Sequence, residues 1–223
     1  MAIPWGSQEQ VGSLRTVPVD LVDLVGGGDA AVLTMELQRG VVGDRSSFPE
    51  LAAAVADGKV VDQTARLLAA ARHAGIPVVH CTAGFRADRL GSAPTAPLIS
   101  AMLKRPAHLL EGTDAVDLVP ELGPEPGDLV SHRRHGVSPF IGTTLDASLR
   151  ALGTRTVVAT GVSLNLGIIG LAVEAVNFGY RVVVAADAVS GIPADYAAAV
   201  LANTIPLVAT VATVDEIIGA MAP

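Results

Sequence analysis

The sequence has little cysteine, few aromatic residues and little charge, and each shortage excludes a class of structure. Its 223 residues include a single cysteine, so no intrachain disulfide and no cysteine zinc site can form. Only 3% of the residues are aromatic while 50% are hydrophobic, so the core must be built from Ala, Val, Leu and Ile. Charged residues make up 17%, below the quarter or so of ordinary soluble domains, which favours a homo-oligomer that hides part of its surface.

Signals for nucleic acid, export or membrane insertion are also missing. A net charge of −7 argues against a nucleic-acid partner, because phosphate backbones are bound by clustered Lys and Arg. The N-terminal residues form neither a basic start nor an apolar signal segment. The uncharged stretch 156–173 is interrupted by glycines and an asparagine, which favours a buried strand followed by a helix over a membrane span. We therefore expect a cytoplasmic protein with no membrane contact.

What the sequence does contain is a regular alternation of apolar strands and amphipathic helices. Strands are predicted over 30–37, 76–81, 128–131, 156–160, 181–185 and 209–212, and helices over 59–74, 96–103, 144–152, 164–178, 194–202 and 214–221. This alternation is typical of an α/β fold with three layers, in which helices cover both faces of a parallel sheet of about six strands. We expect residues 1–29 to form an irregular arm and residues 30–223 a single domain.

In such sheets, ligands bind where the carboxyl ends of the strands meet, which selects the loops 36–40, 81–86, 131–140, 161–167 and 187–191. The loop after the third strand contains His132, Arg133, Arg134 and His135, and it is either an anion-binding loop or a solvated run of charge. No His or Asp cluster has the spacing of metal ligands, so we expect no metal and no cofactor.

Four segments carry a specific resemblance. ARHAGIPVVHC (71–81), AVLTMELQRGVV (31–42) and TVVATGVSLNLGIIGLAVEAVNFGYRVVVAADAVSG (156–191) resemble segments of the isochorismatase-like cysteine hydrolases. The segment 124–153 is similar to the part of that family which carries a lysine followed by a Ser-x-Phe-x-Gly-Thr-x-Leu run, here Ser-Pro-Phe-Ile-Gly-Thr-Thr-Leu over 138–145. The resemblance covers about residues 30–215 and implies the isochorismatase-like fold.

The resemblance implies an Asp–Lys–Cys triad, and this chain departs from it at all three positions. Aligning Gln38 with the family's glutamine puts Glu36 at the aspartate position, and counting along the other segments puts Arg134 at the lysine position and Gly167 at the cysteine position. A glycine has no side chain and forms no thioester intermediate. A guanidinium stabilises an anion but does not give up its proton in proteins.

Two functions remain open for such a chain. The first is a catalytically inactive protein that keeps the fold and binds a small molecule or takes part in an assembly, in one version as a partner of an active paralogue. The second is a hydrolase of small, isochorismate-like anions in which Glu36 acts as general acid. For either function, we expect the charged groups of Glu36 and Arg134 to lie within hydrogen-bond reach. The two residues would then form either part of the functional site or a purely structural ion pair. The residues expected to contact the ligand are Gln38, His135, Phe140, Ser163 and Asn165.

Overall fold

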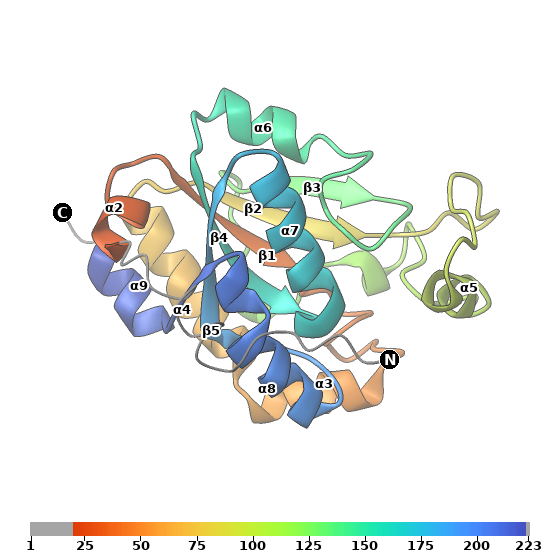
Figure 1. The fold of residues 1–223 in the computed structure, drawn as a ribbon. Helices are drawn as coiled ribbons and strands as arrows, with labels where there is room; N and C mark the ends of the chain where they lie inside the picture. The colour runs from red at the N-terminus through yellow and green to blue at the C-terminus, as the bar shows by residue number, and fades with distance from the viewer. Residues whose placement is uncertain (1–19, 222–223) are drawn as a thin grey trace, which may run out of the picture.

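The structure, a computed structural model, describes residues 20–221 and has a six-stranded sheet between two layers of helices (Figure 1). The strand order is β3-β2-β1-β4-β5-β6, and each neighbouring pair is parallel. This confirms the predicted α/β fold with about six parallel strands. Each strand overlaps an expected one, and their bounds are β1 (Ala30–Met35), β2 (Val78–Ala83), β3 (Leu129–Arg133), β4 (Thr156–Val162), β5 (Arg181–Ser190) and β6 (Thr210–Ala212).

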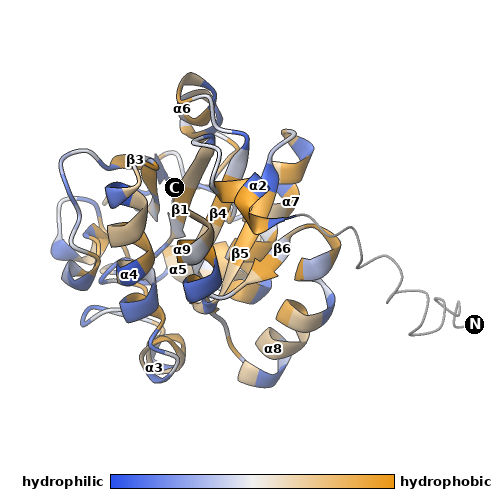
Figure 2. Cartoon of the chain, turned by 90° about the vertical axis from the view of Figure 1, so that its left-hand side faces the viewer, coloured by the Kyte–Doolittle hydropathy of each residue, from blue (hydrophilic) through white to orange (hydrophobic). Residues whose placement is uncertain are grey.

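Two apolar clusters, one on each face of the sheet, hold the layers together. Successive side chains of a strand point to opposite faces, so Val32 of β1 packs into one cluster while Leu33 and Met35 pack into the other. The helices of the first face are α2 (Leu21–Val25), α3 (Pro49–Asp57), α4 (Val60–His73) and α9 (Val214–Met221). Those of the second are α6 (Leu145–Ala151), α7 (Ile169–Asn177) and α8 (Ala194–Asn203). Figure 2 shows the apolar residues gathered on β4, β5 and β6 between the helices.

The remaining helical segments are short or peripheral. Helix α5 (Pro97–Leu103) lies beyond the carboxyl ends of β2 and β3 (Figure 1). Single turns occupy η1 (Asp114–Val116), η2 (Pro120–Leu122) and η4 (Ile205–Leu207), and a π-helical turn, η3 (Leu164–Ile168), precedes α7. Turns of this π type are frequent at functional sites.

Helices α2 and α3 fall in segments for which the sequence analysis predicts none. Helix α2 begins after Asp20, whose carboxylate accepts a hydrogen bond from the Val22 N–H, and its Leu24 and Val25 are buried. Residues 20–29 of the expected irregular arm thus include a helix packed on the domain, and the rest of that arm lies outside the described residues. Helix α3 has a proline in its first turn and ends at Gly58, both of which are helix boundary signals in the sequence.

The strand order reverses between β1 and β4, and this reversal places the ends of these strands where α/β sheets bind ligands. The two strands approach each other closely there. Gly161 pairs with Met35 and has φ +105°, and a Cβ at this position would overlap the Met35 carbonyl oxygen. Only glycine fits, so Gly161 fixes the distance between the two strand ends.

Candidate functional site

A cavity of about 220 Å³ lies at the carboxyl ends of β1, β3, β4 and β5. Its polar side chains come from the ends of these strands and from the turn that follows β4, and its apolar ones come from the surrounding loops, that turn, α3 and α5. Its lining residues are Glu36, Val41, Phe48, Leu51, Leu98, Met102, Arg133, Gly136, Val137, Ser163, Asn165, Leu166, Gly167 and Ile192. The sequence-predicted residues Glu36, Ser163, Asn165 and Gly167 are therefore brought together.

An ion pair between Glu36 and Arg133 forms the polar floor of this cavity. Glu36 directly follows β1, and its N–H donates to the Cys81 carbonyl at 3.0 Å, which continues the pairing of β1 with β2. Its φ is +51°, a left-handed conformation that non-glycine residues adopt mainly where the surrounding structure holds them, often at functional sites. Arg133 Nη2 donates to Glu36 Oε1, and the side chain of Arg133 is only 6% exposed.

The predicted pair between Glu36 and Arg134 is wrong. Arg134 is 51% exposed and its Nε donates to Glu111 Oε1 at 2.5 Å, outside the cavity. The physical reason is the alternation of a strand: β3 continues to Arg133, and neighbouring side chains then face opposite ways, so that only one of the two arginines turns toward Glu36. The sequence predicts this strand only over 128–131, which ends two residues before Arg133. The predicted strand therefore does not show which of the two arginines faces Glu36.

Two polar atoms at the cavity have no hydrogen-bond partner among the described residues. These are Arg133 Nη1, a donor, and Asn165 Oδ1, an acceptor, and both are buried. The orientation of the Asn165 amide is fixed, because its Nδ2 donates to the Ile192 carbonyl at 3.3 Å, a contact that the oxygen could not make. Both atoms are enclosed by protein rather than open to the cavity, and Asn165 Oδ1 faces Gly191, where an added Cβ would lie 2.7 Å from it.

Gly167 lies in the π-helical turn with no room for a side chain. A Cβ would lie 2.8 Å from the Val162 carbonyl oxygen and 3.2 Å from the Met35 methyl group. The missing side chain would therefore point into packed atoms of β4 and β1. Gly167 thus lines the cavity through its backbone, and a side chain there would require these neighbours to shift.

The one cysteine of the chain does not replace that nucleophile. Cys81 lies on β2 with 1% of its surface exposed, and it does not line the cavity. Burial raises the pKa of its thiol to about 12. Because the thiolate is the nucleophilic form, this side chain is a small buried hydrophobe at neutral pH.

Three other sequence-predicted residues lie away from the cavity. Gln38 is fully buried, and its amide bonds to the Ala83 carbonyl, the Ala83 N–H and the Val116 carbonyl, each at 2.8 Å, so it ties the loop after β1 to its neighbours. His135 is exposed and accepts from a loop N–H. Phe140 is in the core, stacked on Phe178 with ring centroids 5.3 Å apart.

Some lining residues escape the sequence analysis altogether, and among these are Phe48, Leu98 and Met102. No signal marks them, since they are apolar residues in segments far apart in the chain. Arg133 is different: it belongs to the basic loop that the sequence does indicate. Within residues 20–221, no group of three or more His, Cys, Asp or Glu side chains is placed to hold a metal ion, and no helix is long and apolar enough to cross a membrane.

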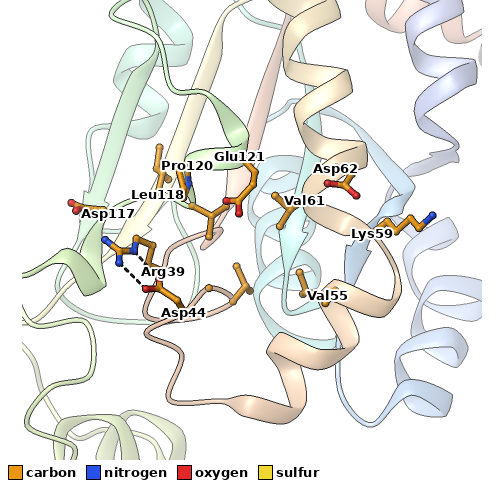
Figure 3. Close-up of a pocket in the computed structure, with 14 residues that line it drawn as sticks. Arg39, Asp44, Val55, Lys59, Val61, Asp62, Asp117, Leu118, Pro120 and Glu121 are labelled. Carbon is orange, nitrogen blue, oxygen red and sulfur yellow. Dashed lines mark hydrogen bonds and ion pairs between the residues drawn. The ribbon is translucent and has the colours of Figure 1, made fainter.

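A second cavity, of about 660 Å³, shares no lining residue with the first. Arg39 and Asp44 face each other at one end of it, and Lys59 lies at the other (Figure 3). Arg39 is bound by Asp44 at 2.8 Å and by Asp114 at 3.2 Å, so its charge is matched within the protein. Arg39 belongs to the predicted site loop 36–40, but none of the individual site residues named from the sequence lines this cavity, and we take the smaller one as the candidate site.

Comparison with known proteins identifies the family of the chain. A model of the isochorismatase domain matches residues 30–216. The ureidoacrylate amidohydrolase RutB of Methylorubrum extorquens is 33% identical over 186 residues, covering 78% of this chain and 75% of the relative. An isochorismatase family protein from Burkholderia thailandensis superposes with a TM-score of 0.74 at 28% identity over 89% of this chain and 98% of the other. An N-carbamoylsarcosine amidase from Thermoplasma acidophilum gives 0.66 at 26% identity over 84% of this chain and 97% of the other.

The family match spans both strands of the switch point and the whole sheet around the cavity. The chain therefore belongs to the isochorismatase family and has the hydrolase fold of that family.

Proposed function

We propose that this protein is a small-molecule-binding member of the family that has lost nucleophilic hydrolysis. One observation carries the proposal: the cavity at the switch point keeps the charged pair of Glu36 and Arg133, but it has no side chain at Gly167. Several relatives are named as amidohydrolases or amidases, so the fold is suited to compounds of small size.

Loss of nucleophilic chemistry follows from the residues that replace it. An activated nucleophile needs a reactive side chain and a neighbouring base. Gly167 supplies no reactive group, and Cys81 lies outside the cavity with a raised pKa. Arg133, the cation that reaches the site, holds its proton permanently and so orients or binds groups without relaying protons.

The geometry supports acid–base hydrolysis by Glu36 less well. A general acid must donate a proton to its substrate. Glu36 Oε1 instead accepts a hydrogen bond from the guanidinium of Arg133 and is held as one half of an ion pair. Glu36 therefore serves to orient Arg133 at the floor of the cavity.

A panel of small acids, amides and esters, each assayed for binding and for turnover, tests the proposal. Binding is measured by thermal shift, since a ligand at 100 times its Kd stabilises the folded state by about 3 kcal/mol. The panel is applied to the wild type, to Arg133→Lys and to the control Arg134→Lys.

We expect at least one compound to stabilise the wild type and Arg134→Lys, to stabilise Arg133→Lys less, and to be recovered unchanged. Hydrolysis of a panel member by the wild type, at a rate that Glu36→Gln lowers, would contradict the proposal. So would a panel without any binder.

A further inference from the structure

A further cavity of about 220 Å³, which we call the arginine cavity, lies at the amino ends of β4 and β5. Its lining residues are Arg150, Thr154, Arg155, Gly179 and Arg181. Three of these five are arginines and none is acidic, although the chain as a whole has a net charge of −7. The candidate site lies at the opposite end of the sheet and shares no lining residue with it. The arginine cavity is therefore a separate concentration of positive charge.

The guanidinium group of Arg150 is held on three sides by the protein. Its Nε donates to Asp146 Oδ1 at 3.2 Å, and its Nη2 donates to the Phe178 carbonyl. Its central carbon lies 4.5 Å from the centre of the Tyr180 ring, in a cation–π contact. These contacts fix the orientation of the group, so a ligand that binds it does not have to order it first.

Arg181 is held in a similar way, by one main-chain carbonyl and one carboxylate. Its Nη1 donates to the Asp23 carbonyl at 3.1 Å, and its Nη2 contacts both carboxylate oxygens of Asp29, at 3.3 and 3.4 Å. The carboxylate of Asp29 is shared, because its Oδ2 also lies 3.9 Å from Arg155 Nε. One negative charge therefore serves two positive ones.

The side chain of Arg155 is the mobile part of the arginine cavity. It is 78% exposed, and within residues 20–221 its guanidinium makes no hydrogen bond, only the ion pair with Asp29. Its main chain is fixed, since its N–H donates to the Asp29 carbonyl at 2.7 Å and its carbonyl accepts from the Arg181 N–H at 2.9 Å. A long side chain on a fixed backbone can turn its donors onto a group that binds beside it.

The charges of this region do not cancel, because the three arginines are paired with only two carboxylates, those of Asp29 and Asp146. The surplus positive charge favours an anion, and it favours a doubly charged anion more than a singly charged one. The planar fork of a guanidinium matches the oxygens of a phosphate. A phosphate group also offers three strong acceptor oxygens, so guanidiniums from three segments can each bind one, whereas a carboxylate has two.

We propose that the arginine cavity binds a phosphate group, either free or carried by a small molecule. Arg150 and Arg181 form the fixed side of the site, and Arg155 closes on the bound group. At the ~30 Å³ that a water molecule occupies in the liquid, a volume of about 220 Å³ holds about seven non-hydrogen atoms, enough for a phosphate and the first atoms attached to it. This inference goes beyond the proposed function and does not depend on it.

The test is an NMR titration of the backbone amides with inorganic phosphate, glycerol 3-phosphate and acetate, at constant ionic strength and at about pH 8, where a phosphate ester is doubly charged. The proteins are the wild type, Arg155→Gln and the control Arg66→Gln. The control removes the same charge from an arginine that is 53% exposed, pairs with Asp215 and does not line the arginine cavity. Urea unfolding of both variants checks that they are folded.

We expect both phosphates to bind saturably, with shift changes centred on Thr154 and Gly179, and acetate to bind more weakly than either. Arg155→Gln should lower the affinity for phosphate about fivefold, and Arg66→Gln should leave it unchanged. Tighter binding of glycerol 3-phosphate than of inorganic phosphate identifies a phosphorylated molecule as the ligand, and equal binding identifies free phosphate. The inference is wrong if neither phosphate saturates, if acetate binds as tightly, if the shifts centre elsewhere, or if the two variants lose affinity equally.

Discussion

Substitution of Gly167 by alanine should destabilise the protein, although replacing a glycine inside a helical segment ordinarily stabilises one. The added Cβ would lie 2.8 Å from the Val162 carbonyl oxygen, which is backbone and cannot move aside as a flexible side chain can. Overpacking of this kind costs about 1–3 kcal/mol, against a propensity gain of up to about 1 kcal/mol. We expect a net loss of about 1–2 kcal/mol for Gly167→Ala.

Gly170 provides the matched control, since it lies in the following helix α7 and a Cβ there would lie 3.7 Å from its nearest neighbour, Ser138 Cβ. Gly170→Ala should be neutral or stabilising by up to about 1 kcal/mol. Urea unfolding of the two variants at neutral pH measures the difference, which should be about 1–3 kcal/mol. A Gly167→Ala variant as stable as Gly170→Ala would refute the claim that a Cβ does not fit at this position.

The same packing bears on restoring the nucleophile. Gly167→Cys introduces a thiol, but it meets the same Val162 carbonyl and it finds Arg133 rather than a proton-relaying lysine. We expect this variant to be destabilised like Gly167→Ala and to hydrolyse no amide of the test panel. Hydrolysis by the single variant would show that the surrounding site is still competent.

Four further outcomes are expected. Arg133→Met should lower the free energy of unfolding by about 2–3 kcal/mol, because it leaves the partly buried carboxylate of Glu36 unpaired. Arg134→Met, which removes an exposed ion pair, should lower it by less than about 1 kcal/mol. Equal losses in urea unfolding would contradict the geometry. Burial lowers the pKa of His108 to about 4, so between about pH 6.5 and pH 4 the unfolded state binds a proton that the folded state does not bind. The free energy of unfolding should therefore fall by up to about 3 kcal/mol as the pH drops through this range. His108→Phe should flatten this slope, and an unchanged slope of unfolding free energy against pH would show that other groups cause it. The Cys81 thiol should react with a thiol reagent only when the protein unfolds, and rapid labelling of the native protein would overturn its assignment as a buried hydrophobe. Light scattering should give a mass above 22.6 kDa if the low charge reflects a homo-oligomer, and a monomer across micromolar concentrations would exclude it.

The sequence predicts the sheet well because its strands are apolar runs separated by helices with strong periodicity. Each observed strand overlaps an expected one, and the rule that ligands bind at the carboxyl ends of strands selects the loops that form the cavity. Helix α3 is missed although Pro49 and Gly58 mark its ends.

The site is predicted less completely, because it depends on side-chain direction. Glu36, Ser163, Asn165 and Gly167 line the cavity as their loops suggest. The choice between Arg133 and Arg134 depends on where β3 ends, and a difference of one residue reverses the face of a strand. The apolar residues that line the cavity come from segments far apart in the sequence, so no local sequence pattern predicts them.

The central claim, that the family's cavity is kept as a binding site without hydrolysis, is tested most directly by NMR mapping of the wild type with the member of the acid, amide and ester panel that gives the largest thermal shift. The account predicts chemical-shift changes confined to the lining of the smaller cavity, at residues such as Met102, Val137 and Leu166, with the compound still intact after long incubation. Shift changes centred on Arg39 and Lys59 in the larger cavity, or hydrolysis of the compound, would contradict it.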